Sequence, residues 1–337
     1  MIGEQDKERI KDVRSIYRNL KIPSRHIPYV FMCPKEKNGD VGFIMYIYGG
    51  DAFWFYYDEG QMRVDIPSDG YKKHFRAEKR GEEILGKLSK ITSATEQIEL
   101  IKLWPESVWG ELCEAFYFWA LKVRVPFGKQ QNPEFERMRQ THICYANSDN
   151  DDIRVFDMEE KMKLQDDSGE PEADILSLRH DANGNPIFSI IEYKCTTAAV
   201  KGDVSIPEHY RDMVKYYRDK NTISKLIRLY EWKQEFDERS IEEIDEGAVD
   251  RTEIVFLFSN VKWDKTQKGI GLPEINESMC VTKKNIYNKL LKIKDEEGFE
   301  KHKPNIKVLF INDADIDEVR LYSDKMMSYE QALEQLK

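Results

Sequence analysis

The sequence predicts a mixed α/β protein: a mixed sheet flanked by helices and preceded by an N-terminal α+β module. Two observations support this prediction. Apolar and aromatic runs with strand character recur between stretches of helical periodicity. Late in the chain, strands alternate with helices, which is typical of a sheet covered on both faces. The 337 residues are 40% hydrophobic and 12% aromatic, enough to form a folded core of one or two domains.

Residues 1–103 are predicted to form the N-terminal module, with a role in recognition or assembly. Its first element is a helix over residues 5–20, where apolar residues recur on one face. Three stretches dense in β-branched and aromatic residues follow, separated by turn signals, which predicts a meander of three or four strands. Helical patterns return over residues 71–102. The run Phe53–Tyr57 fits a two-sided core strand or an inter-domain contact better than a base-stacking surface.

The second domain is predicted to span residues 104–337. It opens with a helix from Val108 to about Val123, which Ser107 could cap, and a polar loop follows. The asparagine- and glycine-containing turn before Pro186 predicts a hairpin between two of the strands that come next. The further expected elements are strands at 153–158, 173–178 and 187–193, a helix at 207–232, an acidic loop at 234–252, a strand at 253–258, a helix at 282–293, a strand at 306–311 and a helix at 328–336.

Composition narrows the classes of protein that the chain can represent. The net charge of −10 argues against nonspecific coating of nucleic acid, although residues 71–102 and 121–145 are locally basic and could hold a phosphate backbone. No apolar run reaches the roughly 18 residues of a membrane span, and the charged N-terminus lacks a signal-peptide pattern. The five scattered cysteines favour reduced thiols over disulfides or structural zinc. We therefore expect a cytoplasmic protein without a membrane partner.

Three charged residues on two adjacent strands form the strongest candidate for a catalytic site. Asp174 lies at the start of one strand, and Glu192 and Lys194 lie two residues apart at the end of the next, so these two share a face. A hairpin would bring all three together. Two carboxylates can hold Mg²⁺, or Mn²⁺ in its place, and the lysine can orient water or stabilise negative charge in the transition state. Phosphodiester hydrolysis requires stabilisation of charge on the scissile phosphate and a deprotonated water, which this set of groups can supply.

The tripeptide Glu-x-Lys occurs three times in the chain, at residues 159–161, 192–194 and 231–233. The third falls in a helical pattern, where residues two apart do not share a face. The first follows a strand that has no apolar, acid-bearing strand just upstream. The alternative for the middle set is a surface salt-bridge cluster, which its apolar flanks make less favourable. Only residues 192–194 combine a buried strand with an acid in register.

This arrangement resembles the PD-(D/E)XK nuclease superfamily, whose motif joins a Pro-Asp-like segment to Asp/Glu-x-Lys. The element order from about 107 to 311 is also similar to that family's restriction-endonuclease-like core. The segment Pro171-Glu172-Ala173-Asp174 stands in place of an adjacent Pro-Asp pair, which leaves Glu172 as an alternative ligand to Asp174. The resemblance implies a Mg²⁺-dependent DNA endonuclease of the restriction or phage-defence type, with Asp174 and Glu192 as metal ligands.

The resemblance also implies functional residues around this core. Many members carry a glutamate on the helix before the first strand, which completes the metal site. Here Glu114 is the first candidate and Glu111 the alternative. A polar residue often follows on the helix after the lysine strand, where His209 could contact phosphate. Lys201, on the loop just past the site, could meet the nucleic-acid backbone.

Other interpretations of the chain stay open. One is a DNA repair or junction-resolving nuclease, and another is a non-catalytic nucleic-acid-binding or assembly subunit with the same fold. DNA is favoured over RNA through the resemblance alone. A second copy of the chain or a protein of a defence system is a further expected partner.

Overall fold

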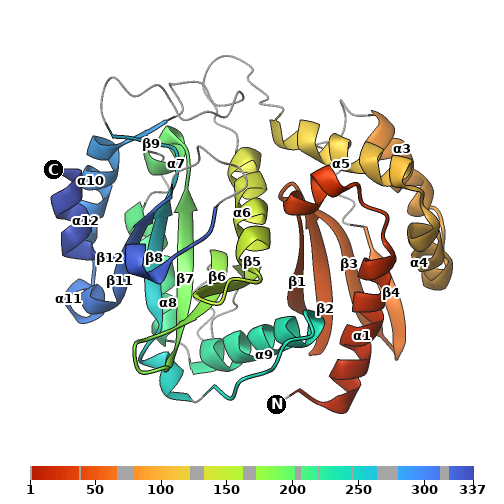
Figure 1. Cartoon of the computed structure of the whole chain (residues 1–337), viewed down its shortest axis with the longest axis horizontal. Coiled ribbons are helices and arrows are strands. Elements are labelled where there is room, and N and C mark those ends of the chain that lie inside the picture. The colour runs from red at the N-terminus through yellow and green to blue at the C-terminus, as the bar shows by residue number, and fades with distance from the viewer. Residues whose placement is uncertain are drawn as a thin grey trace. The chain divides into compact units, whose positions relative to one another are not determined.

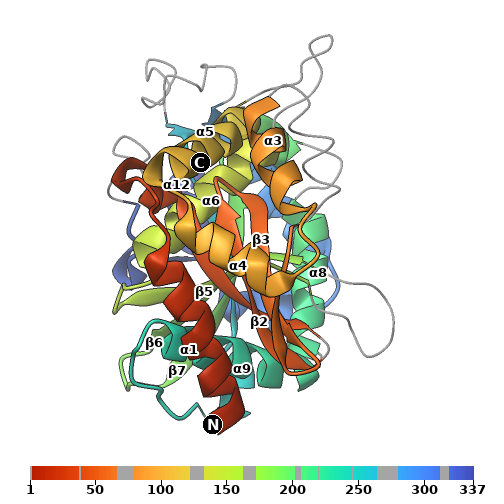
Figure 2. The ribbon, with the colours of Figure 1, turned by 90° about the vertical axis from the view of Figure 1, so that its right-hand side faces the viewer.

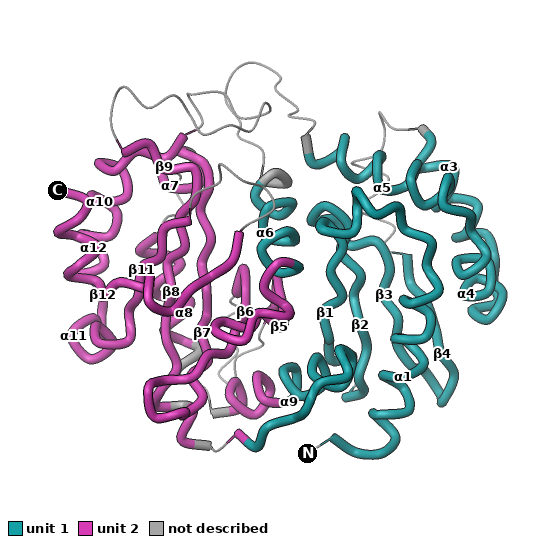
Figure 3. The backbone as a smooth tube through the Cα atoms, in the orientation of Figure 1, with its two compact units in different colours: residues 1–145, 228–243 teal, residues 146–227, 244–337 magenta. Residues whose placement is uncertain are grey.

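The computed structural model describes most of the chain, namely residues 2–37, 39–66, 79–121, 133–161, 172–201, 206–218, 220–244, 246–263, 280–311 and 319–337. Parts of the two basic stretches, residues 71–78 and 122–132, lie outside this description. The chain divides into two compact units (Figure 3). Unit 1 comprises residues 1–145 with 228–243, and unit 2 comprises residues 146–227 with 244–337.

This division differs from the expected boundary at residue 103. Helix α5 (Glu106–Leu121) and most of α6 (Pro133–Asn147) belong to unit 1 rather than to the second unit. Helix α9 (Lys220–Phe236) begins in unit 2 and ends in unit 1. Each unit is therefore built from two separate segments of the chain.

Unit 1 is built on an antiparallel sheet in the order β1–β2–β3–β4, which confirms the predicted meander. Its strands are β1 (Val30–Lys37), β2 (Asp40–Ile47), β3 (Gly50–Asp58) and β4 (Gln61–Asp65). Tyr48 and Gly49 form the turn between β2 and β3 with φ of 50° and 84°, the conformation that two-residue hairpin turns require. A Cβ at Gly49 would lie 2.5 Å from the backbone of Arg137, so glycine is required there.

Helices pack against the sheet of unit 1. They include α1 (Glu4–Asn19) and α4 (Ala94–Leu103), whereas α3 (Lys79–Leu88) contacts α5. Helix α1 contacts β2 and α4 contacts β4, and Figure 2 shows both in front of the sheet. Phe53 packs against Trp104 and Trp109, with ring centroids 6.2 and 5.9 Å apart. Phe53 and Phe55 are buried whereas Trp54 and Tyr56 are only half-buried. The strand therefore has one core face, not the two that a two-sided core strand would have.

Unit 2 contains a mixed sheet in the order β12–β11–β8–β7–β6–β5 (Figure 1). Strands β5, β6 and β7 are antiparallel neighbours, whereas β7, β8 and β11 run parallel. All residues of β8, and all of β7 except the first, are buried, which confirms a sheet covered on both faces. The strands are β5 (Ile153–Lys161), β6 (Glu172–His180), β7 (Pro186–Lys194), β8 (Glu253–Phe258), β11 (Ile306–Phe310) and β12 (Met327–Ser328).

Helices α8 and α9 lie in the range where one helix is predicted, residues 207–232, and α10 and α12 lie close to their predicted ranges. The sequence does not predict α7 or α11. A short parallel pair, β9 and β10, precedes α10. The remaining elements are α7 (Thr197–Lys201), α8 (Ile206–Arg218), β9 (Val261–Lys262), β10 (Val281–Thr282), α10 (Lys283–Lys292), α11 (Phe299–His302) and α12 (Tyr329–Leu336).

Helix α6 corrects the prediction of a polar loop before the first strand of the second domain. Its buried residues include Arg139, Gln140 and His142 beside Met138 and Ile143. A helix that buries so many polar side chains lacks the apolar stripe by which a helix is recognised in sequence. The helix was therefore missed.

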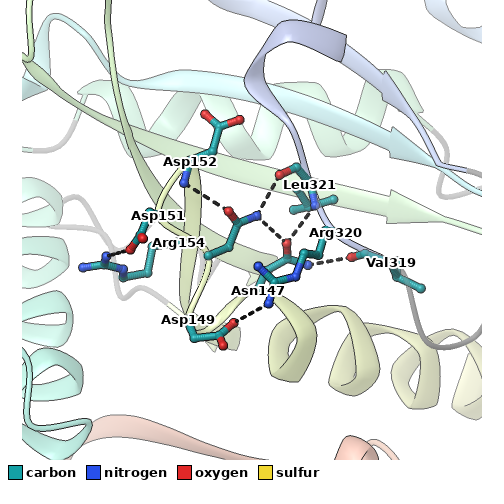
Figure 4. A network of polar contacts seen from close by, with 9 residues as sticks. Asn147, Asp149, Asp151, Asp152, Arg154, Val319, Arg320 and Leu321 are labelled. Atoms are coloured by element: carbon teal, nitrogen blue, oxygen red, sulfur yellow. Dashed lines mark hydrogen bonds and ion pairs between the residues drawn. The ribbon is translucent and has the colours of Figure 1, made fainter.

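Two asparagines at the end of α6 hold a distant segment in unit 2 (Figure 4). Asn147 donates to the carbonyl of Val319 (2.7 Å) and accepts from the backbone N–H of Leu321 (2.7 Å). Asn150 donates to the carbonyl of Leu321 (2.8 Å) and accepts from the backbone N–H of Asp152 (3.0 Å). These buried amides satisfy backbone groups that would otherwise be costly to bury.

All five cysteines are buried and none forms a disulfide. In the part of the chain that is described, no helix combines the length and apolar character needed to cross a membrane.

Candidate active site

Strands β6 and β7 bring Asp174, Glu192 and Lys194 together, as predicted. The register pairs Ile175 with Ile191, which places Asp174 beside Glu192 one step further along the hairpin. The backbone N–H of Tyr193 donates to Oδ2 of Asp174 at 2.8 Å. The Nζ atom of Lys194 lies 3.9 Å from the same oxygen and forms an ion pair with Oε1 of Glu192.

These three side chains are shielded from solvent. Glu192 is 1% exposed, Lys194 6% and Asp174 17%. The interpretation as a surface salt-bridge cluster is therefore excluded. Charges in such a place interact more strongly than in water, and their burial costs free energy that only good partners offset. Asp174 is the most accessible of the three.

His209, from the first part of α8, extends the cluster. Its Nδ1 atom lies 3.2 Å from Oε1 of Glu192. Burial, and then the positive charge of Lys194, lower the pKa of His209 to about 4. The imidazole is therefore neutral at neutral pH, so it adds a hydrogen-bonding group beside Glu192 without adding a charge. Its predicted contact with phosphate stays a prediction.

Polar contacts at the end of β8 hold the segment around Lys194. The backbone N–H of Ser259 donates to the carbonyl of Lys194 at 3.1 Å. The hydroxyls of Ser259 and Tyr193 are 2.6 Å apart. Asn260 donates its amide to the carbonyl of Cys195 at 3.2 Å. Sequence reasoning missed these residues, because only the parallel pairing of β7 with β8 brings them next to the lysine.

Glu114 and Glu111, the candidates for a further metal ligand, lie on α5 in unit 1. Glu114 is ion-paired with Arg25 at 2.6 Å and Glu111 with Arg80 at 2.8 Å. Helix α6 intervenes between α5 and β5, so α5 is not the helix that directly precedes the first strand of the mixed sheet. Neither glutamate therefore lies on the helix where the resemblance places a metal ligand, and a role in metal binding stays a prediction.

The two remaining candidates lie at the margins of the site. Glu172, two residues before Asp174 on β6, is 36% exposed and lies 3.4 Å from Lys161. Lys201 is the exposed last residue of α7, rather than part of a loop as expected. Asp174 has the closer relation to Glu192 and Lys194.

The donor chemistry of the cluster suits a hard divalent cation. Asp174 and Glu192 supply carboxylate oxygens, the type of ligand that Mg²⁺ takes from one or two side chains while it keeps several waters. With His209 neutral, the carboxyl groups of Asp174 and Glu192 lie beside the single ammonium of Lys194 in a mostly buried place. No set of three or more His, Cys, Asp and Glu side chains in the described residues is arranged to hold a metal. The fit therefore depends on the carboxylate pair.

Comparison with known proteins gives no relative for this chain. It matches no protein-family model, no curated protein and no solved structure. The chemistry of the site therefore has to be inferred from its own residues.

Proposed function

We propose that the protein is a metal-dependent nuclease that hydrolyses phosphodiester bonds at Asp174, Glu192 and Lys194. The observation that carries this proposal is the convergence of two carboxylates and one ammonium at the end of β7, with Tyr193 fixing one oxygen of Asp174. The pattern of residues resembles the PD-(D/E)XK superfamily, and the hairpin and mixed sheet are compatible with its restriction-endonuclease-like core.

Asp174 and Glu192 are the residues that would hold Mg²⁺. When bound, such an ion polarises a phosphoryl oxygen and lowers the pKa of its water to make a nucleophile. Asp174 presents a carboxylate at the accessible side of the cluster, and Glu192 presents one from the buried side. The backbone N–H of Tyr193 restricts the rotation of the Asp174 carboxylate, so that its position is set before substrate binds.

Lys194 and His209 would act on the phosphate and on Glu192. The ammonium of Lys194 is a compact charge with three donors, and it can stabilise the negative charge that grows on the phosphate oxygens during attack. The neutral imidazole of His209 can hold the Glu192 carboxylate in place through their 3.2 Å contact. DNA as the substrate, and a role in restriction or phage defence, follow from the resemblance.

Cleavage of plasmid DNA with Mg²⁺ tests this function. We expect the unaltered protein to nick or linearise the plasmid, and EDTA to stop the reaction. Glu192→Ala and Lys194→Ala should each lower the rate by about 10²-fold or more, since each removes a group that acts on the transition state. Circular dichroism and thermal melting of each variant verify that it folds.

Glu172→Gln is the matched control, because it removes a carboxylate from the same face of β6. Its activity should stay within a few-fold of the parent. If Glu172→Gln loses activity and Asp174→Asn does not, Glu172 is the ligand. Cleavage that survives both Glu192→Ala and Lys194→Ala would overturn the assignment of the site, and DNA binding without any cleavage would favour a non-catalytic subunit.

A further inference from the structure

A group of lysines lies on three neighbouring elements of unit 2. Residues 197–201, 261–263 and 280–292 contain six lysines and no aspartate or glutamate, in a chain whose net charge is −10. We call this group the lysine surface. Its members are Lys201 on α7, Lys262 on β9, and Lys283, Lys284, Lys289 and Lys292 on α10.

The lysine surface adjoins the candidate active site. Helix α7 begins at Thr197, just after Lys194, and the Thr197 hydroxyl donates to the carbonyl of Cys280. The backbone N–H of Val281 donates to the carbonyl of Asn260 at 3.1 Å. Helix α10 contacts both α7 and α8, the helix that carries His209. In Figure 1, α7, β9 and α10 lie at the end of β7 where that strand leads into α7.

Helix stability does not explain two of these lysines. Lys283 and Lys284 open α10 directly after its cap Thr282, and no acid lies in that first turn. The N-terminus of a helix carries partial positive charge, so cations there are unfavourable. Lys289 and Lys292 lie in the last turn of α10, where the helix dipole favours positive charge. Helix stability therefore explains these two lysines.

Carboxylates do not neutralise the exposed members of this surface. Among the described residues, none lies within ion-pair distance of Lys201 or Lys284, and both side chains are exposed. The nearby acids of α8 are paired within their own helix, Glu208 with Arg211 (3.3 Å) and Asp212 with Lys215 (2.9 Å). Exposed ammonium groups such as those of Lys201 and Lys284 suit an external polyanion.

We propose that the lysine surface binds the phosphodiester backbone of a nucleic acid beside the scissile phosphate. Each ammonium would contact a phosphate as a point charge and release condensed counterions. Because the lysine surface lies next to β7, it would bind the stretch of nucleic acid on one side of the scissile phosphate while the candidate site acts on that phosphate. The inference rests on the proposed nuclease function, because that function defines which phosphate is cleaved. Binding of the nucleic-acid backbone to the lysine surface does not itself require cleavage.

Binding measured in EDTA tests the surface separately from cleavage. The probes are a short fluorescein-labelled DNA duplex and its single strand, titrated by anisotropy at several NaCl concentrations. Lys201→Gln/Lys284→Gln should weaken binding by about tenfold and reduce the slope of log affinity against log salt by about 2, close to one per phosphate contact. Its melting temperature should not fall, because Lys284 is unfavourable at a helix N-terminus.

Lys303→Gln/Lys337→Gln is the matched control, since it removes two charges in unit 2 that are paired with Glu330 and Glu334. The proposal is overturned if both double variants weaken binding equally, or if the unaltered protein binds neither probe. Selective weakening in the first double variant without any Mg²⁺-dependent cleavage would support the surface and contradict the nuclease. Cleavage that depends on Glu192, together with unchanged DNA binding by Lys201→Gln/Lys284→Gln, would support the nuclease and contradict the lysine surface.

Discussion

Two buried ion clusters lie at opposite ends of the same hairpin strands in unit 2. At the candidate site, Lys194 stands between Glu192 and Asp174. Near the other end of β6, Arg179 donates two hydrogen bonds to Glu253 at 2.7 and 3.0 Å. Both clusters are largely buried, with Glu192 1% and Glu253 6% exposed.

The two clusters differ in geometry and in which charge is more numerous: two cations face one carboxylate at Glu253, whereas two carboxylates face one ammonium at the candidate site. The planar guanidinium of Arg179 matches both oxygens of Glu253, and Lys307 adds a second cation 3.8 Å away. At the candidate site, the ammonium of Lys194 is a point charge that pairs closely with Glu192 and lies 3.9 Å from Asp174. Burial of charge alone therefore does not mark a catalytic site. A buried cluster in which carboxylates outnumber cations is the better candidate, because a metal ion could bind to it.

Removal of Glu253 should be the most damaging change to the stability of unit 2. Glu253→Ala leaves Arg179 buried without its carboxylate, which typically costs about 3–5 kcal/mol. Urea denaturation followed by circular dichroism measures this free energy. The double variant Arg179→Met/Glu253→Leu should recover most of the loss, because neither charge then stays buried alone. A cost below about 1 kcal/mol for Glu253→Ala would show that the pair does not stabilise the sheet.

His142 lies outside both clusters and shows how burial affects a titratable side chain. Burial, followed by the charge of Arg139, lowers the pKa of His142 in unit 1 to about 4. The unfolded chain, with a histidine pKa near 6.5, then binds more protons than the folded one in the interval between these values. Stability should therefore fall as the pH drops from about 6.5 to 4, by on the order of 3 kcal/mol for this one group.

His142→Phe tests that pH dependence. The ring of His142 packs against Tyr29, with centroids 5.0 Å apart, so an apolar ring of similar size should be accommodated. Urea denaturation of the parent and the variant at several pH values gives the difference in slope. Equal losses of stability between pH 6.5 and 4 in the two proteins would contradict the lowered pKa of His142.

The sequence was most informative where one local rule decides the structure. Strand periodicity of two places Glu192 and Lys194 on one face, and the turn before Pro186 joins two apolar runs into a hairpin. Together these rules place Asp174 beside them. The mixed sheet followed from the same apolar runs, since β7 and β8 are buried on both faces.

Sequence reasoning failed where distant segments or polar burial decide the structure. Helix α6 buries Arg139, Gln140 and His142, and no amphipathic pattern marks it. Because α6 was missed, Glu114 was assigned to the helix before the first strand. The lysine surface could not be predicted either, because its members come from three segments that meet only through β9, β10 and α10.

Replacement of Glu192 should leave the free energy of unfolding unchanged or slightly raise it, whereas replacement of Glu253 should lower it. Without metal, Glu192→Gln removes one of two competing carboxylates and leaves Lys194 beside Asp174. We expect the free energy of unfolding to stay equal or to rise by about 1 kcal/mol, as is common when an active-site charge is removed. The measurement is urea denaturation in EDTA. A loss comparable to that of Glu253→Ala would mean that Glu192 is a structural residue.

The smallest effect should come from Lys307, the outer cation of the Arg179–Glu253 cluster. Its side chain is 24% exposed and its Nζ lies 3.8 Å from Oε1 of Glu253, whereas Arg179 already binds both oxygens. Lys307→Met should therefore cost at most about 0.5 kcal/mol, the usual range for a partly exposed pair. Lys194→Met is the matched change at the site and should cost clearly more, because it leaves two carboxylates without their ammonium. Equal losses of stability for the two variants in urea would show that Lys194 is no more important to its two carboxylates than Lys307 is to Glu253, which would contradict a carboxylate-rich site at Asp174 and Glu192.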